Sequence, residues 1–206
     1  MKKVWNADEK LSIERSLIAK GYKYIAGVDE VGRGPLAGPV VCAAVIMPLD
    51  SESLVIGVDD SKKLSAKKRE ELAELIKKRA LAYTVYEVSE KEIDEINILE
   101  ATKKGMREAL LALEIAPDTV ITDGNMTLDI PFEQASVVHG DALSYSIGAA
   151  SIVAKVYRDA LMDEYAKQYP GYGFEKNKGY GTAEHIKGIK ERGLCPIHRR
   201  TFTKKF

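Results

Sequence analysis

The chain has 206 residues, 45% of them hydrophobic and 30% charged, and its 31 acidic side chains balance its 31 basic ones. This composition predicts a soluble globular protein of one domain and excludes a disordered chain, and no apolar run is long enough to span a membrane. The two cysteines form no metal-type pair, and the charged N-terminus lacks the apolar middle of a signal peptide. These features predict a cytoplasmic location.

The basic residues are unevenly distributed. Residues 176–206 carry nine Lys or Arg against two acids, and five further basic side chains lie between residues 62 and 69. Such asymmetry favours a polyanion as partner, although a run of charge is more often a solvated face.

Apolar spacing predicts alternating helices and strands along the chain. We expect an amphipathic helix over 8–20, hairpin strands near 24–31 and 37–47, and a weak strand over 54–58. A helix capped by Ser65 should run to residue 79, followed by a strand over 80–88 and helical stretches over 90–95 and 98–114, with Leu75 and Leu99 facing the core.

The second half of the chain continues the pattern. Short buried strands are expected over 119–122 and 135–138, and the longest helix over 143–169. A loop rich in Gly and Tyr over 170–182 then leads to a last helix over 182–192. Strands interleaved with helices predict an α/β fold.

The hairpin carries the first functional signal. Its apolar first strand leads into Asp29 and Glu30, and its bend is Gly32-Arg33-Gly34-Pro35. Glycines let a ligand approach the backbone, and carboxylates at the end of a buried strand attract a hard cation. The alternative is a tight hairpin with a solvated acidic tip.

Acids also follow two later strands, at Asp123 and Asp141. Taken singly, Asp123-Gly124 suits a turn, and Asp141 suits a helix N-cap. Four acids at the ends of three apolar strands would repel one another without a cation, so together they predict a divalent-metal site. Oxygen ligands without His or Cys favour Mg²⁺ or Mn²⁺, and two such ions suit phosphodiester cleavage.

One geometric difficulty remains within this set. Neighbouring residues of a strand face opposite ways, so Asp29 and Glu30 reach one metal only under one of two conditions. Either the strand bends at the glycine turn, or Glu30 contributes through its backbone.

Other site types find no support. Gly32-x-Gly34 precedes a strand, not a helix, so it is no dinucleotide-binding motif, and residues 173–179 lack the Lys-Ser/Thr of a phosphate loop. The three histidines are scattered, with no Ser or Cys nucleophile motif beside them.

Several sequence blocks, in a fixed order over nearly the whole chain, resemble the ribonuclease HII family. They are Gly27-Val-Asp-Glu-Val-Gly-Arg-Gly-Pro-Leu-Ala-Gly-Pro-Val, Asp60-Ser-Lys-Lys-Leu, Ile121-Thr-Asp-Gly, Gly140-Asp, Ala149-Ala-Ser-Ile-Val-Ala-Lys-Val-Tyr-Arg-Asp, Gly179-Tyr-Gly-Thr with His185, and His198-Arg199.

The resemblance implies a ribonuclease-H-like fold, with a mixed central sheet flanked by helices and a helical C-terminal part. Residues 1–206 would form a single catalytic domain, with an N-terminal helical extension over 1–22 and a substrate-binding segment over 170–206. The implied activity is endonucleolytic cleavage of the RNA strand in RNA–DNA hybrids. It includes nicking 5′ of ribonucleotides embedded in duplex DNA, which leaves a 3′-hydroxyl and a 5′-phosphate and serves ribonucleotide removal.

The resemblance also implies roles for individual residues. The catalytic residues, which would hold Mg²⁺ or Mn²⁺, are Asp29, Glu30, Asp123 and Asp141. The substrate-binding residues are Gly32, Arg33 and Gly34, which sense the ribose 2′-hydroxyl; Tyr180, which stacks at the RNA–DNA junction; and Lys62 and Lys63, which contact phosphates. For Tyr180 the alternative is an ordinary loop aromatic.

Two further residues have structural interpretations. We expect Asp159, in mid-helix, to form a structural ion pair, while Arg199 either anchors the C-terminal segment or touches phosphate. The short N-terminus and the fourth acid in Gly-Asp fit ribonuclease HII better than ribonuclease HIII, and we expect a monomer. The rival hypothesis, a non-catalytic binding module, would need at least one of the four acids to be missing.

Overall fold

A five-stranded sheet forms the centre of the protein, whose residues 5–206 are described by a computed structural model. The strands are β1 (Ile25–Val31), β2 (Val40–Ile46), β3 (Ala82–Val88), β4 (Thr119–Asp123) and β5 (Glu133–Val137). Their order in the sheet is β3-β2-β1-β4-β5. Pairing is antiparallel for β3-β2 and β2-β1 but parallel for β1-β4 and β4-β5, so the predicted mixed sheet is confirmed.

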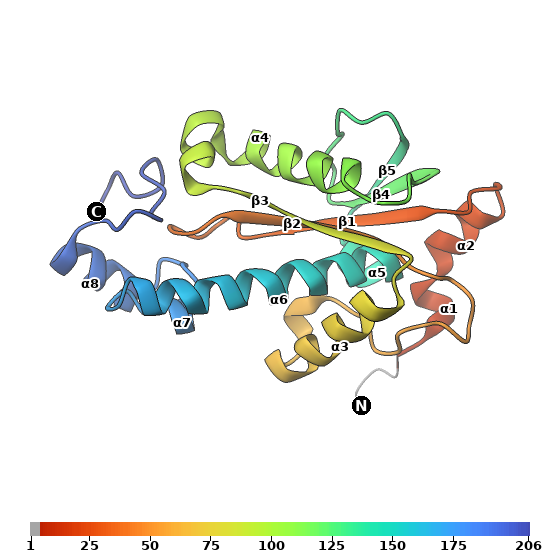
Figure 1. The fold of residues 1–206 in the computed structure, drawn as a ribbon, viewed down its shortest axis with the longest axis horizontal. Coiled ribbons are helices and arrows are strands. Elements are labelled where there is room, and N and C mark those ends of the chain that lie inside the picture. Colours follow the sequence, from red (N-terminus) through yellow and green to blue (C-terminus); the bar gives the residue numbers. More distant parts are fainter. Residues whose placement is uncertain (1–4) are drawn as a thin grey trace.

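Helices cover both faces of this sheet (Figure 1). Helices α3 (Ala66–Arg79) and α6 (Tyr145–Gln168) lie on one face, and α4 (Glu90–Leu111) lies on the other. Alternate residues of β2 therefore enter different cores: Val41, Ala43 and Val45 pack toward α3 and α6, while its other residues pack toward α4. A strand that is buried on both faces has a continuous run of apolar residues, and the sequence of β2 is such a run.

Helix α6 lies unusually close to β1. A Cβ atom added to Gly27 would lie 2.3 Å from the carbonyl carbon of Ser146, so only glycine fits at this crossing. Small residues along the first half of α6 allow the approach. Since Asp29 lies two residues beyond Gly27 on the same face of β1, its side chain also points toward α6.

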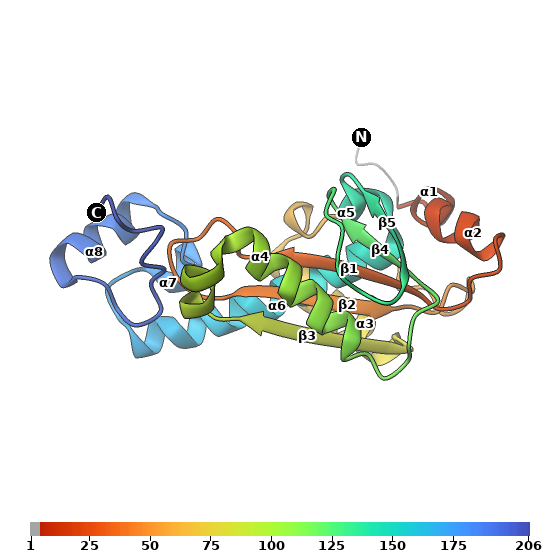
Figure 2. The same ribbon diagram turned by 90° about the horizontal axis from the view of Figure 1, so that it is seen from above.

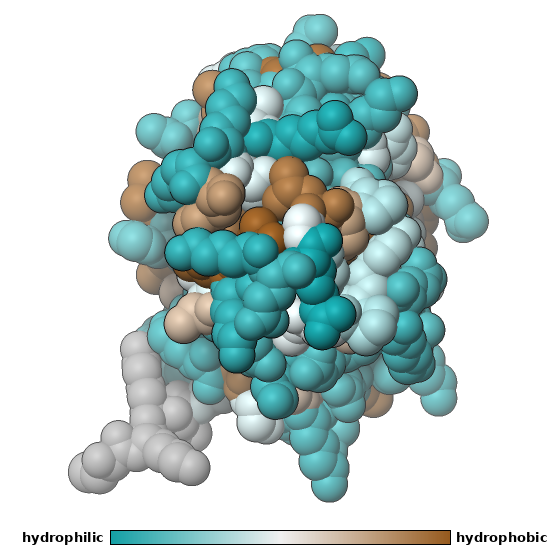
Figure 3. All heavy atoms as spheres, turned by 90° about the vertical axis from the view of Figure 1, so that its left-hand side faces the viewer, coloured by the Kyte–Doolittle hydropathy of each residue, from teal (hydrophilic) through white to brown (hydrophobic). Residues whose placement is uncertain are grey.

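The C-terminal part gathers at one end of the molecule, beside the connection between β1 and β2 (Figure 2). It contains α7 (Phe174–Asn177), α8 (Ala183–Arg192) and residues 193–206. A separate cluster of buried side chains joins it to that connection and to α6: Ala37, Met162, Tyr172, Phe174, Ile189 and Ile197. Hydrophilic side chains cover most of the outer surface of this end (Figure 3).

The N-terminal segment lies toward the other end, where α1 (Ala7–Lys10) and α2 (Ser12–Ile18) adjoin α5 (Gly140–Leu143) (Figure 1). The predicted single helix over 8–20 is therefore divided at Leu11, whose φ and ψ of −98° and 5° interrupt it. Residues 1–4 of the predicted extension over 1–22 lie outside the described residues.

Other expected elements differ in detail. Residues 54–58 form no strand, because Val55 and Val58 are buried by packing against the α3–α6 core and not by strand pairing. The longest helix begins at Tyr145, after the separate helix α5, and α7 interrupts the expected loop over 170–182. Asn97, with φ of 67°, bends α4 between the two predicted helical stretches.

Two expected core positions were wrong. Leu75 and Leu99 are each 42% exposed, because both lie at the edge of the apolar stripe of their helices. None of the helices in residues 5–206 combines the length and the apolar character that a membrane crossing requires.

Candidate active site

The sheet brings the predicted acids toward one place. Parallel pairing sets Val28 beside Thr122, so the next residues, Asp29 and Asp123, lie level on neighbouring strands. Asp123 also pairs with Val137 at the end of β5, and the chain then enters α5, which carries Asp141. The ends of three strands thus deliver acids to one region, as their order along the chain predicted.

Short hydrogen bonds fix two of these carboxylates. The Glu30 amide donates to Asp29 Oδ1 at 2.8 Å, and the Gly140 amide donates to Asp123 Oδ1 at 2.7 Å. The second of these bonds links the first turn of α5 directly to β4.

The carboxylates disfavour one another's charge. Burial raises the pKa of Asp29 well above its usual range, and repulsion from Glu30 and Asp123 adds to this. Burial also raises the pKa of Glu30, although attraction to Arg33, whose Nη1 lies 3.5 Å from Glu30 Oε1, opposes the shift. Buried acids with raised pKa values in a cluster are a recurring property of functional sites.

Asp141, which is 6% exposed, shows the same behaviour. Burial raises its pKa, repulsion from Asp123 and Asp60 adds to the shift, and Lys62 opposes it. Lys62 Nζ lies 3.5 Å from Asp141 Oδ2, and its side chain is 80% exposed. The exposed ammonium of Lys62 therefore places a positive charge next to Asp141, on the side of the acids that faces solvent.

The residues present fit a divalent cation by their chemistry. Their donors are carboxylate oxygens, and Glu30 Oε2 is buried without a hydrogen-bond partner among the described residues. A cation at the acids would relieve their repulsion and give this oxygen a partner. Within residues 5–206, however, no group of three or more acidic, His or Cys side chains is arranged to hold one ion.

The alternation of side chains along β1 is one reason why the acids do not converge on a single ion. Glu30 pairs with Cys42 of β2, whose side chain belongs to the core on the α4 face, whereas Asp29 faces α6. The two acids therefore leave β1 toward opposite faces, which is the difficulty expected from their adjacency. Each nevertheless lies close enough to the other to affect its pKa.

The bend after β1 is held from inside by two fully buried arginines. Arg199 Nη1 donates to Arg33 O at 2.9 Å, Nη2 donates to Gly32 O, and Nε donates to Gly38 O at 2.9 Å. Arg158 donates to Ala37 O at 3.1 Å through Nη2. Gly32, with φ of +93°, would place an added Cβ 2.2 Å from Arg158 Nε, so glycine is required here.

Comparison with known proteins decides the family. The sequence profile of the family Ribonuclease HII matches residues 26–205. The chain belongs to the ribonuclease HII family. It is therefore a hydrolase of the ribonuclease H type.

Relatives and solved structures agree with this assignment. The chain is 54% identical over 196 residues to a ribonuclease HII of Ruminiclostridium cellulolyticum, covering 95% of this chain and 76% of the relative. It is 54% identical over 202 residues to one of Bacillus licheniformis, covering 98% and 77%. The crystal structure of a ribonuclease H2 from Pyrococcus horikoshii superposes with a TM-score of 0.74 at 29% identity, covering 88% of this chain and 94% of that chain. The expected ribonuclease-H-like fold is confirmed.

In this member of the family, Tyr180 lies beside the glycine bend. An added Cβ on Gly34 would be 3.5 Å from Tyr180 Cε1, and the tyrosine is 45% exposed. Its carbonyl contacts His185 Nδ1 at 2.9 Å, and His185 Nε2 contacts His198 Nε2 at 3.0 Å. The Tyr180 backbone is thus held by a buried histidine pair, while the residue remains 45% exposed.

Lys62 and Lys63 lie on a single 3-10 turn, η1 (Ser61–Lys63). Asp60 caps the turn by accepting from the Lys62 amide at 2.9 Å, and Ser61 Oγ contacts Ser151 Oγ at 3.0 Å. The contact with Ser151 joins this turn to α6, while the Lys63 side chain is 60% exposed.

The two residues with structural interpretations are now placed. Asp159 forms ion pairs with Lys155 at 2.7 Å and Arg69 at 3.8 Å, which confirms the predicted structural pair. Arg199 is fully buried and binds backbone carbonyls, so of its two predicted roles the structure supports anchoring.

Sequence reasoning missed two buried charged residues near the site, Lys10 and Glu14. Both lie in the N-terminal segment and contact the region around α5. Their spacing of four residues, continued by Leu17, was a usable signal that all three share a buried face.

Proposed function

We propose that the chain is an endoribonuclease that cuts the RNA strand of RNA–DNA hybrids. It also nicks duplex DNA 5′ of an embedded ribonucleotide, leaving a 3′-hydroxyl and a 5′-phosphate. The observation that carries the proposal is the gathering of Asp29, Glu30, Asp123 and Asp141 beside an exposed glycine bend. The cytoplasmic location, the monomeric state and the single domain expected from the sequence belong to the same proposal.

The four acids are the residues that would hold Mg²⁺ or Mn²⁺. When bound, such ions activate water and stabilise the leaving oxygen of a phosphodiester. The chain itself keeps Asp29 and Asp141 buried and close to other carboxylates, which raises their pKa values, and a bound cation would relieve this repulsion.

The glycine bend offers a means of detecting the ribose. The carbonyls of Gly32 and Arg33 point inward to Arg199. In a trans peptide the N–H points away from its C=O, so the amides of Arg33 and Gly34 point away from the guanidinium. Both residues are exposed, and these N–H groups are suited to hydrogen-bond a 2′-hydroxyl, which distinguishes RNA from DNA.

The remaining substrate contacts follow from exposure and charge. Tyr180 is exposed beside the bend and is suited to stack on a base or sugar there. Lys62 and Lys63 supply positive charge on the solvent side of the acids, where the backbone phosphates would lie. The segment over 170–206 would complete the binding surface, because it carries Tyr180 and the local excess of basic residues.

The test uses a labelled DNA duplex with one internal ribonucleotide, incubated with Mg²⁺, with Mn²⁺ or with EDTA. We expect one metal-dependent nick 5′ of the ribonucleotide and none in the matched all-DNA duplex. An Asp123→Asn variant should bind the duplex without nicking it. Tight binding by the unaltered protein with no nick under either metal would instead favour the non-catalytic binding module.

A further inference from the structure

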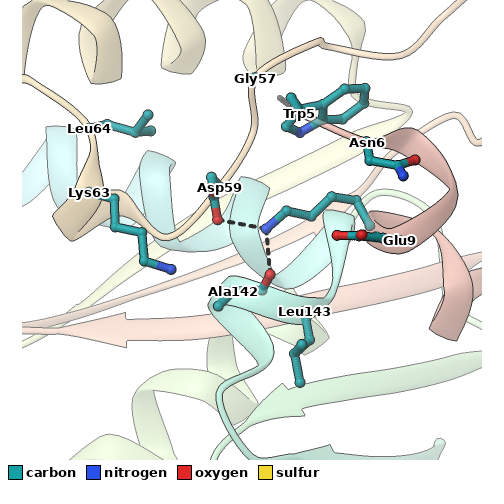
Figure 4. Close-up of a pocket in the computed structure, with 10 residues that line it drawn as sticks. Trp5, Asn6, Glu9, Gly57, Asp59, Lys63, Leu64, Ala142 and Leu143 are labelled. Carbon is teal, nitrogen blue, oxygen red and sulfur yellow. Dashed lines mark hydrogen bonds and ion pairs between the residues drawn. The ribbon is translucent and has the colours of Figure 1, made fainter. Parts of the chain in front are cut away.

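The N-terminal segment contacts the candidate active site although it lies outside the matched family region, residues 26–205. Its first described residue is Trp5, whose Nε1 donates to Val58 O at 2.8 Å, and α1 and α2 follow. Together with residues 57–64 and α5 it lines a cleft, part of which is shown in Figure 4. Its contacts suggest a role beyond covering the core.

Lys10 is the central residue of these contacts. It is 9% exposed, and its Nζ donates to Asp59 Oδ1 at 2.6 Å and to the carbonyl of Ala142, as the dashed lines at these two residues show (Figure 4). Burying an ammonium group is unfavourable unless it is paired and hydrogen-bonded. Lys10 meets this requirement by joining two segments that are distant in sequence.

The first segment is α5. Ala142 directly follows Asp141 in this four-residue helix, which starts after His139 in the left-handed conformation, with φ of 58°. So short a helix has little stability of its own, because nucleation fixes several residues for few hydrogen bonds. The bond from Lys10 to the Ala142 carbonyl therefore restrains the backbone beside Asp141.

The second segment is the turn that carries Lys62. Asp59 Oδ1 accepts from the Asp60 amide at 2.8 Å, and Asp60 in turn caps η1. Since Lys62 Nζ lies 3.5 Å from Asp141, the ammonium of Lys10 fixes both sides of this contact.

Glu14 contacts the residue that ends α5. It is fully buried, and its Oε1 accepts from Ser144 Oγ at 2.6 Å and from the Ser146 amide at 2.9 Å. Ser144 closes α5 and caps α6. Two charged side chains of the N-terminal segment thus contact the C-terminal half of the short helix, at Ala142 and at Ser144.

We propose that Lys10 is a positioning residue for Asp141, holding α5 and η1 so that the Asp141 carboxylate is presented to the metal. The inference rests on the proposed function only in taking Asp141 as a metal ligand. Lys10 itself touches neither substrate nor metal.

The experiment compares Lys10→Met, which keeps the length of the apolar stem, with Lys20→Met, an exposed lysine of the same segment. Hydrogen exchange is measured on metal-free protein for peptides covering residues 139–145, and Mn²⁺ binding is measured by calorimetry without substrate. We expect Lys10→Met to exchange faster over α5 and to bind Mn²⁺ about tenfold more weakly, the usual effect of losing an outer contact of a metal site. Lys20→Met should match the unaltered protein in both.

Nicking supplies a third measurement. The Lys10→Met variant should need about tenfold more Mg²⁺ for half-maximal rate, with KM for the duplex unchanged, because Lys10 does not contact substrate. Equal exchange and equal metal affinity in the two lysine variants would overturn the proposal, even if Lys10→Met lowered the melting temperature.

The experiment also covers two further outcomes: misfolding of Lys10→Met, and failure of the proposed function. If Lys10→Met does not fold, Asp59→Asn removes the charge partner and is measured in the same way, and unchanged exchange over α5 would then overturn the proposal. If the unaltered protein nicks no duplex, the proposed function fails, while hydrogen exchange and Mn²⁺ binding still decide whether Lys10 positions Asp141.

Discussion

Replacing Asp29 with asparagine should stabilise the metal-free protein while abolishing nicking. Asp29 is 4% exposed, and burial first, then Glu30 and Asp123, raise its pKa. Because its folded-state pKa lies above the unfolded value, its ionisation opposes folding, and stability falls as pH rises through the folded-state pKa. The asparagine Oδ1 can still accept from the Glu30 amide, so the local hydrogen bond is kept.

We expect the free energy of unfolding of Asp29→Asn in EDTA at pH 7 to be about 1 kcal/mol higher than that of the unaltered protein. A gain of this size is typical when a substitution removes an unfavourable interaction from a functional site. For a chain of this size that corresponds to a melting temperature about 2–4 °C higher. The gain should vanish toward about pH 4, where the unfolded-state aspartate is protonated too. Added Mg²⁺ should stabilise the unaltered protein more than the variant.

Urea unfolding at pH 4, 7 and 8, with and without Mg²⁺, tests these expectations. Asp129→Asn is the matched control, because Asp129 is exposed and the same change should have almost no effect there. An Asp29→Asn protein no more stable than the unaltered one at pH 7 and 8 in EDTA would refute the argument that the acids repel one another.

Four further changes probe other parts of the molecule. Arg199→Lys cannot keep all three carbonyl bonds, so we expect a loss of about 3 kcal/mol in urea unfolding and weaker preference for the ribonucleotide duplex over DNA. Tyr180→Ala should lose about 1–3 kcal/mol of duplex binding, measured by fluorescence anisotropy, while Tyr180→Phe keeps the stacking face and should lose little. Lys62→Gln should reduce the slope of log affinity against log salt by about one, and an unchanged slope would exclude a phosphate contact. Burial lowers the pKa of His198 to about 4. Below about pH 6.5 the imidazole is therefore protonated in the unfolded chain, while in the folded protein it stays neutral down to about pH 4. A His198→Gln variant should therefore lose about 2 kcal/mol less stability than the unaltered protein between pH 7 and pH 4.5 in urea titrations.

Local patterns predicted most of the architecture. Apolar runs ending in polar residues located the strands, and Ser65 and Thr182 each cap the helix expected after them. The ion pair predicted for Asp159 from its mid-helix position is confirmed, and its partners are Lys155, one helical turn away, and Arg69. The gathering of the acids followed from the rule that strand ends meet at one edge, while their role as ligands stays a prediction.

Long-range contacts were beyond the sequence patterns. The bonds of Arg199 to Gly32 and of Lys10 to Ala142 span 167 and 132 residues, and no periodicity connects such positions. The weak strand over 54–58 was wrong for a related reason. Apolar character is the same whether a residue packs in a core or pairs in a sheet, and here tertiary packing decided the outcome.

The guanidinium of Arg199 has a consequence for biosynthesis. The glycine bend emerges early in translation, yet the donor for its Gly32 carbonyl is made 167 residues later. Domains fold as the chain is produced, so a nascent chain synthesised through α5 already carries all four acids but not the group that holds the bend. An intermediate of this kind would lack the ordered bend, and the ribose detection proposed for the bend would be established only once the chain has been synthesised through Arg199.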